Sequence, residues 1–243
     1  MKTTSDRMNA CARPIDRRID SHEADNGSSG SIGRVASRVT VSVTLAAALS
    51  VTSCATTPPL EERTPTAVVP PLPMPVRESG TFYRTVSTTD GEEHGWEVLE
   101  VADDGTFEAR DVDGCRWTSV ADPFAPGVAW SGCGGGRWGT GEATIASSSG
   151  GLWPLAPGNE AKWSARNVAK DGTRASSTRR CEVSGPFAVT VAVGDVDALR
   201  VVCEDERARR TTYWTAEHGE VKKTVVVSGS LEYDRELVAI ERR

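Results

Sequence analysis

The sequence predicts an all-β fold, and three observations support this prediction. Short runs of alternating apolar and polar residues follow one another from Trp96 to Ile240, broken by turn-forming Gly, Asp and Pro residues. No segment of this region holds a convincing helical period. The same region contains an even number of cysteines, as is typical of exported domains stapled by disulfides: Cys115, Cys133, Cys181 and Cys203. We therefore expect one domain over residues 80–243, an antiparallel sandwich or an open, curled half-barrel.

The expected strands follow in chain order, mostly as hairpins. Residues 96–100 pair with 107–109 through the turn signal Asp104-Gly105. Residues 159–170 carry an interrupted helical pattern, so we assign them as a strand. The seven tryptophans, all within the expected domain, are the predicted core residues. The other expected strands are 115–120, 128–131, 187–203 with a break at Gly194-Asp195, 211–215, 221–227 and 231–240.

The segment before this domain divides into three parts. Residues 1–34 are polar and rich in Gly and Ser, so we expect a disordered lead-in. A start at Val35, with a GTG codon read as Met, would leave this lead-in untranslated. Residues 35–53 predict an export signal, in which an apolar run that starts at Val39 follows Arg34 and Arg38 and is too short to span a bilayer. Residues 54–79 hold seven of the 13 prolines and predict an extended tether.

The end of the apolar run, Val51-Thr52-Ser53-Cys54, resembles the lipobox of bacterial lipoproteins. The family more often has Leu where this chain has Val51. The resemblance implies that Cys54 carries lipid, palmitate included, and anchors the protein to a membrane of the cell envelope. Because Ala55 rather than Asp follows the cysteine, it also implies the periplasmic face of the outer membrane in an organism with two membranes. An ordinary buried strand, or a signal cut by another peptidase, is the alternative.

The four domain cysteines allow three pairings, and we favour the one that is local in sequence, Cys115–Cys133 and Cys181–Cys203. Each pair would close a loop of about 20 residues, for which chain entropy predicts about 3 kcal/mol of stabilisation. A metal site would need close ligand pairs such as C-x₂-C, which are absent from the sequence. We therefore predict neither a metal nor a cofactor.

The charge of the chain argues against nucleic acid as a partner. Subtracting the 7 basic and 5 acidic residues of 1–53 from the totals of 28 and 34 leaves a net charge of −8 on residues 54–243. Phosphate backbones need Lys and Arg, so such a balance disfavours them. The short basic clusters Arg179-Arg180 and Arg207–Arg210 are interpreted as solvated strand ends.

No residue pattern singles out catalytic chemistry. His94 and His218 stand beside glycines and are expected in exposed turns, and the loop expected at Ser147–Ser149 has no histidine near it. The glycine-rich stretch 132–139 lacks the Gly-Lys-Ser/Thr of a phosphate-binding loop. Paired carboxylates could hydrolyse glycosides, but the candidates are many: Asp103, Asp104, Glu182, Asp195, Glu204, Asp205, Glu206, Glu217 and Glu220. The sequence thus favours a protein that is not an enzyme.

The last 90 or so residues resemble a family of uncharacterised secreted bacterial β proteins. The similarity rests on residues 152–158, 189–201, 211–214 and 218–222, which match a Pro-Leu opening, a Val-rich hairpin and a Thr-x-Tyr-Trp strand. It implies a curved antiparallel sheet and brings no catalytic residues.

The function that we expect is a lipid-anchored envelope protein with a structural or binding role, its partner an envelope protein or a glycan. The alternatives are an envelope hydrolase that acts on cell-wall or glycan material, and a carrier whose curved sheet shelters an acyl chain.

Overall fold

The computed structural model describes residues 60–243, which form twelve antiparallel strands. Cys54, the signal segment and the lead-in all lie outside the described residues. The described part contains no helix of the length and apolarity needed to cross a membrane. The strands are β1 (Thr81–Ser87), β2 (Glu93–Val101), β3 (Phe107–Asp111), β4 (Arg116–Ser119), β5 (Ala129–Ser131), β6 (Gly141–Gly150), β7 (Glu160–Ala169), β8 (Arg174–Val191), β9 (Gly194–Glu204), β10 (Ala208–Thr215), β11 (Gly219–Val227) and β12 (Ser230–Arg242).

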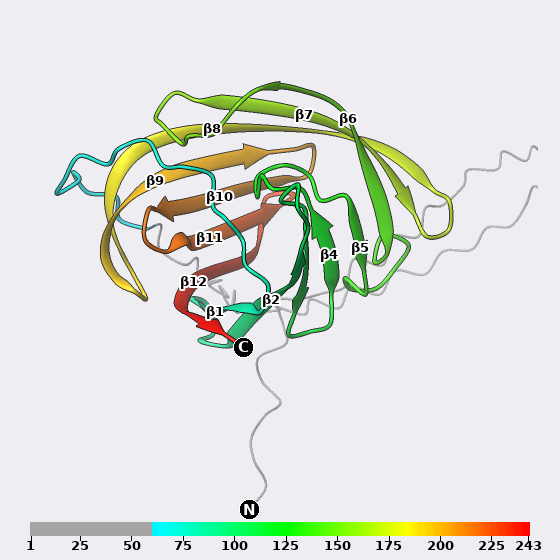
Figure 1. Ribbon diagram of the computed structural model, residues 1–243, viewed down its shortest axis with the longest axis horizontal. Helices are drawn as coiled ribbons and strands as arrows, with labels where there is room; N and C mark the ends of the chain where they lie inside the picture. The colour runs from blue at the N-terminus through cyan, green and yellow to red at the C-terminus, as the bar shows by residue number, and fades with distance from the viewer. Residues whose placement is uncertain (1–59) are drawn as a thin grey trace, which may run out of the picture. The chain divides into compact units, whose positions relative to one another are not determined.

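Each strand pairs with its neighbours in sequence, and β1 also pairs with β12, so the sheet closes into an up-and-down barrel (Figure 1). The all-β prediction is confirmed, but the expected sandwich or half-barrel is corrected to a closed barrel. Closure depends on β1, which the sequence analysis did not assign. Its residues Thr81 and Ser87 face Arg242 and Arg235 of β12, and the other edge of β1 pairs with β2.

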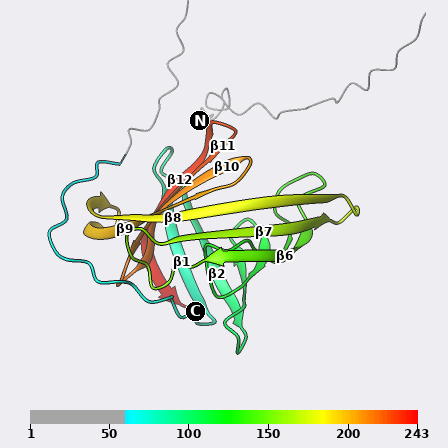
Figure 2. The ribbon, with the colours of Figure 1, turned by 90° about the horizontal axis from the view of Figure 1, so that it is seen from above.

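Two further strands include residues for which the sequence predicted no strand. The segment around Ser147–Ser149, expected as a loop, belongs to β6, and β8 begins at Arg174 rather than near Phe187. Residues 146–150 and 174–176 are exposed at every position, so they lack the alternation that marks a half-buried strand, whereas alternation begins again at residues 180–183 of β8. Residues 160–169 form strand β7, as predicted. Strands β7 and β8 run side by side along the domain (Figure 2).

The two ends of the barrel differ. In an up-and-down barrel, consecutive turns lie at alternate ends, so the β4–β5 and β6–β7 connections share one end and the β3–β4 and β5–β6 connections share the other. The first end is filled by a core cluster that includes Phe124 of the β4–β5 connection, Leu152 and Leu155 of the β6–β7 connection, and Trp214 of β10. Apolar side chains therefore close one end of the barrel.

Residues 60–79, which we call the strap, lie on the barrel. Leu72 is 1% exposed and forms an antiparallel bridge with Leu155, and Arg63 forms another with Ala188. The sequence predicts residues 54–79 as an extended tether. Residues 60–79 instead lie against the barrel, because the apolar Leu72 joins the core and the backbone groups of Arg63 and Leu72 form hydrogen bonds with those of Ala188 and Leu155.

Both disulfides are present, in the sequence-local pairing. Cys181 and Cys203 face each other across β8 and β9 and are buried in the core. Cys115 and Cys133 join the β3–β4 turn to the β5–β6 connection at the end of the barrel that the core does not fill.

Candidate functional site

The interior of the barrel holds a cavity of about 950 Å³ that adjoins a second one of about 500 Å³. Both are lined by Trp117, Pro123, Glu220 and Lys223, so these residues stand where the two chambers meet. We call the two chambers together the lumen. Their volumes lie within the range of sites for small molecules, roughly 300–1,000 Å³. The lumen is therefore the candidate functional site.

One wall of the lumen is aromatic. Trp96 of β2, Trp117 of β4 and Trp130 of β5 all line it, and Phe107 of β3 lies among them. The rings of Trp96 and Trp117 lie 5.8 Å apart, and Trp117 faces Trp130 across the β4–β5 pair. The sequence predicts all seven tryptophans as core residues. Trp96 and Trp117 do pack against the buried cluster of Val98, Phe107 and Ala109, and they also border the cavity, because inward-facing positions of a wide barrel line its interior.

The opposite wall is cationic. Arg179 of β8, Arg210 of β10 and Lys223 of β11 line the inner chamber. Arg210 donates to the Asp205 carboxylate at 2.5 Å. Burial raises the pKa of Asp205, but this bond, the backbone bonds from Arg207 and Ala208 and the charge of Arg210 together outweigh burial and lower it. Glu220 lies 3.6 Å from the Lys223 ammonium and raises its pKa, so Lys223 stays charged. Two of the three cations therefore have carboxylate partners.

Arg179 has none among residues 60–243. Its Nη1 donates to the carbonyl oxygens of Phe124 and Ala125, at 3.0 and 3.1 Å, and its Nε is buried without a hydrogen-bond partner. Burial, followed by repulsion from Arg210, lowers the pKa of its guanidinium to about 10. A buried cation without a counter-charge is costly, so the charge of Arg179 needs an explanation.

Two more arginines of the lumen share this property. The guanidinium of Arg77, from the strap, lies 5.2 Å from the ring centroids of Tyr83 and Trp96, and that of Arg235 lies 4.6 Å from Tyr233. Each has a buried Nε without a hydrogen-bond partner, and neither forms a salt bridge within the described residues. Aromatic rings stabilise such cations but leave their charge uncompensated.

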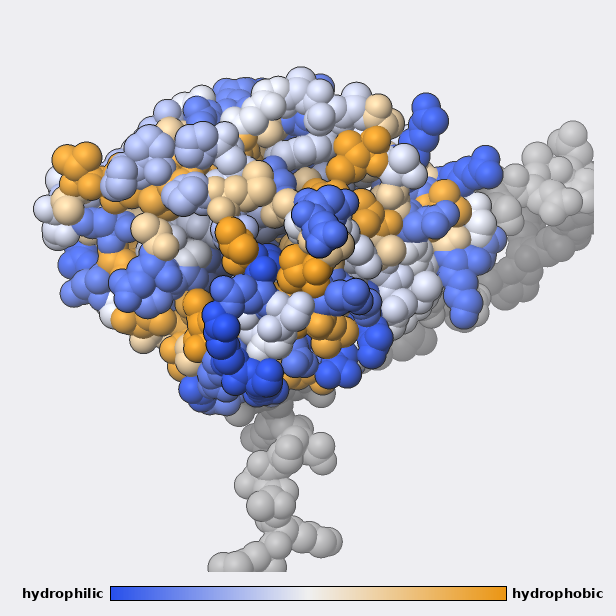
Figure 3. Space-filling view, in the orientation of Figure 1, coloured by the Kyte–Doolittle hydropathy of each residue, from blue (hydrophilic) through white to orange (hydrophobic). Residues whose placement is uncertain are grey.

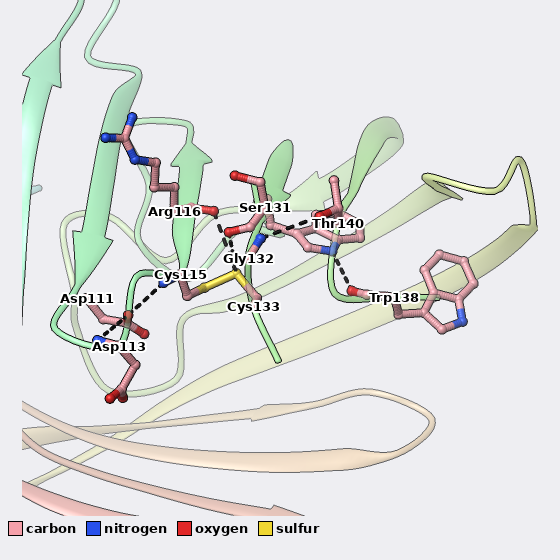
Figure 4. The surroundings of a disulfide bond; sticks show 10 residues. Asp111, Asp113, Cys115, Arg116, Ser131, Gly132, Cys133, Trp138 and Thr140 are labelled. Atoms are coloured by element: carbon pink, nitrogen blue, oxygen red, sulfur yellow. Dashed lines mark hydrogen bonds between the residues drawn. A yellow bond between two sulfur atoms is a disulfide. The ribbon is translucent and has the colours of Figure 1, made fainter. Parts of the chain in front are cut away.

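The mouth of the lumen lies at the disulfide-linked rim. Asp113, Gly134 and Glu232 are exposed residues that line the outer chamber there. Figure 4 shows the Cys115–Cys133 bond beneath the β5–β6 connection, with the indole of Trp138 projecting away from it. Trp130 Nε1 donates to the carbonyl oxygen of Trp138 at 2.8 Å and so holds this loop against the barrel.

The structure corrects the interpretation of the two basic clusters. Arg179 and Arg210 face the lumen, whereas their neighbours Arg180 and Arg209 pair with surface acids. The alternation of strand residues predicts the inward position of Arg179, because Arg179 shares its face with the buried Cys181. Its adjacency to Arg180 in the sequence instead suggested a single exposed basic cluster.

The residues expected to carry other chemistry are not brought together. Most of the candidate carboxylates lie in turns at the ends of the barrel or on outer strand positions. Glu220 of β11 differs from them, because it lines both chambers. His218 lies in the β10–β11 turn, as expected, but it is half-buried rather than exposed. His94 lies within β2 and is also half-buried. Residues 60–243 contain no group of His, Cys, Asp and Glu side chains that could hold a metal ion.

Comparison with known proteins yields little. No protein-family model and no curated protein matches the chain. The chain is similar to a crystal structure from Bacteroides fragilis described as an exported protein with a YmcC-like fold, at 12% identity and a TM-score of 0.32. The match covers 70% of this chain and 98% of the other. A similarity at this level carries no inference about function.

Proposed function

We propose that this protein is a lipid-anchored binding protein of the cell envelope, and that its lumen binds an anionic saccharide. The proposal keeps the binding role expected from the sequence and adds a site and a ligand class. It rests chiefly on one observation, the three lumenal arginines Arg77, Arg179 and Arg235, whose buried Nε atoms have no partner and which form no salt bridge within residues 60–243.

An anionic ligand supplies what these arginines lack. A carboxylate or phosphate accepts charge-assisted hydrogen bonds from guanidinium groups, which are stronger than bonds between neutral groups. The positive wall is also a local feature, because residues 54–243 as a whole carry a net charge of −8. The two chambers together are lined by six basic and four acidic residues, so basic residues are in excess in the lumen although the chain as a whole is acidic.

The aromatic wall favours a ligand with a ring. The flat apolar face of a sugar packs against an indole ring, while its hydroxyl groups accept and donate hydrogen bonds at its edge. Trp96, Trp117 and Trp130 lie on β2, β4 and β5, the rings of Trp96 and Trp117 are 5.8 Å apart, and Ser119 lines the cavity beside them. An acidic or phosphorylated sugar would place its ring on this wall and its charge toward Arg179 or Arg235.

The acyl-chain carrier receives less support. A chain of methylene groups would desolvate Arg179, Lys223 and Glu220 without giving them hydrogen bonds, and burying charged groups in this way is expensive. A carrier of fatty acids would be expected to have a lumen lined by aliphatic side chains. Here the largest fully buried aliphatic residues, such as Leu152, Leu155 and Val183, fill the closed end instead.

The anchor and compartment remain part of the proposal. The lipobox resemblance at Cys54 supports attachment of the protein to a membrane. The two disulfides of the domain support an oxidising compartment, because disulfides form and persist there. Cys54→Ala is expected to release the protein from membranes or leave it unprocessed. A processed but unlipidated form that still pellets with membranes would contradict the anchor.

The ligand class is tested on the mature chain carrying Cys54→Ala, with glucose, glucuronate and glucose 6-phosphate as probes. These share one ring and differ in charge. We expect the charged sugars to change the tryptophan fluorescence and raise the melting temperature, and glucose to do so only at much higher concentration. A comparison of the responses to glucuronate and to glucose 6-phosphate shows whether the site recognises a carboxylate or a phosphate. Equal responses to all three sugars, or a response to palmitate alone, would overturn the proposed ligand class.

A further inference from the structure

The strap presents an apolar strip to solvent. No charged residue occurs between Arg63 and Arg77, and seven apolar residues of this stretch are exposed: Ala67, Val68, Pro70, Pro71, Pro73, Met74 and Val76. Val68 is 93% exposed and Val76 is 88% exposed. Single exposed apolar residues are ordinary, but seven of them within ten residues, interrupted only by Val69, Leu72 and Pro75, mark a contact surface.

This strip is held in place by contacts on its other side. Glu62 accepts hydrogen bonds from Arg200 Nη1, at 2.7 and 2.9 Å, and from the Tyr213 hydroxyl. Burial and Glu62 raise the pKa of Tyr213, so its hydroxyl keeps the proton that it donates. Leu72 is buried in the core. The strip is therefore displayed on a fixed segment.

More contacts fix the beginning of the strip. The backbone N–H and the hydroxyl of Thr66 donate to the Asp197 carboxylate, at 2.9 and 2.6 Å. In Figure 1 the strap crosses the face toward the viewer, and in the same orientation Figure 3 shows apolar patches along its course. Within residues 60–243, no element covers Val68 or Val76.

Chain length limits what can lie opposite the strip. Six Cα steps separate Cys54 from Leu60, where the strap begins, and a fully extended chain spans at most about 20 Å over that distance. A lipid on Cys54 would thus keep the start of the strap close to the bilayer surface. We propose that the apolar strip of the strap rests on that bilayer, so that the domain is held against the membrane in a defined orientation.

This inference rests on the lipid anchor of the proposed function, but not on the lumen ligand. The strip carries no charge, so its contact depends on apolar side chains entering the interface rather than on attraction to anionic lipid. A lipid on one residue attaches the domain to the membrane but leaves its orientation free. The strip would supply the second contact that fixes this orientation.

The experiment places an environment-sensitive fluorophore on Val68→Cys, on Val76→Cys or on Lys162→Cys in the lipidated chain. Lys162 is the control, because it is an exposed position on β7. Each protein is reconstituted in phosphatidylcholine vesicles that contain nitroxide-labelled lipid. We expect severalfold stronger quenching at positions 68 and 76 than at 162, and the same result when phosphatidylglycerol is added. Equal quenching at all three positions would refute the contact.

A second variant separates the causes of failure. Val68→Asp/Val76→Asp should keep the fold and the anchor, but its strap should become accessible to a soluble quencher. If the unsubstituted chain carries no lipid at Cys54, the inference falls together with the anchor. If it is lipidated and the strip is not quenched, only the contact with lipid is refuted. Protection of the strip in cells but not in vesicles would assign it to a protein partner and likewise overturn the proposal.

Discussion

Replacing Arg179 with Met should barely change the stability of the unliganded protein while weakening its binding of anions. The fall in the pKa of Arg179 to about 10, from the ordinary value of a guanidinium, corresponds to about 3 kcal/mol of unfavourable free energy at neutral pH. Met removes this cost, and it also removes the two hydrogen bonds to Phe124 and Ala125, which together contribute about 3 kcal/mol. The two effects nearly cancel, so we expect a change of about 1 kcal/mol or less.

Arg210→Met is the matched control, because Arg210 lines the same chamber but has a carboxylate partner. Removing one member of a buried ion pair costs about 3–5 kcal/mol. The side chains of Arg210 and Asp205 are 28% and 16% exposed, and Asp205 keeps backbone bonds from Arg207 and Ala208. We therefore expect a smaller loss, about 2–3 kcal/mol.

Urea unfolding followed by tryptophan fluorescence measures both changes, and titration with glucuronate and glucose 6-phosphate measures binding. Loss of a charge-assisted bond worth about 1.5–3 kcal/mol should weaken anion binding by Arg179→Met roughly 10- to 150-fold. If Arg179→Met lowers the unfolding free energy as much as Arg210→Met does, the guanidinium of Arg179 serves to stabilise the fold rather than to bind a ligand. Unchanged anion binding would show that Arg179 does not face the ligand.

Three other predictions concern the fold. Asp234 is buried, but bonds from Lys222, Thr224 and Thr88 outweigh burial and lower its pKa. Its contribution to stability is therefore complete above the ordinary carboxyl pKa and is lost as pH falls through the lowered value. Asp234→Asn should therefore make the unfolding free energy fall less steeply below about pH 4. The same fall with pH in the variant and in the unsubstituted chain would contradict this. Cys181→Ser/Cys203→Ser should cost about 3 kcal/mol in urea unfolding, because it opens a 22-residue loop within the core; a neutral result would mean that the core relaxes around the serines. Leu72→Ala should cost about 2–5 kcal/mol and make the strap sensitive to protease; resistance equal to that of the unsubstituted chain would show that the polar contacts hold it alone.

The class of the fold and most strands could be predicted because hairpins are local. The Asp104-Gly105 signal and the break at Gly194 both mark turns in the structure, and nearby cysteines on adjacent strands pair with each other. Barrel closure could not be predicted, since it depends on the pairing of Thr81–Ser87 with a strand about 150 residues away. No local pattern in the sequence encodes that distance.

The lumen was missed for a related reason. A tryptophan at an inward strand position looks the same whether it meets packed side chains, as Trp163 and Trp214 do, or a cavity, as Trp117 does. Arg179 and Arg180 form one basic cluster in the sequence, although strand alternation places their side chains on opposite faces of the sheet. Only the closed barrel shows which face is inside.

The pairing of β1 with β12 also has a consequence for how the protein matures. Ribosomes deliver the amino end of a chain first, so β1 waits for a partner that is made about 150 residues later. Until then, the growing sheet has two open edges that can pair with other chains, and the long-range contact slows its closure. We therefore expect shortened chains that lack β12 to aggregate, and chains that include β12 to become resistant to protease only after this strand has emerged.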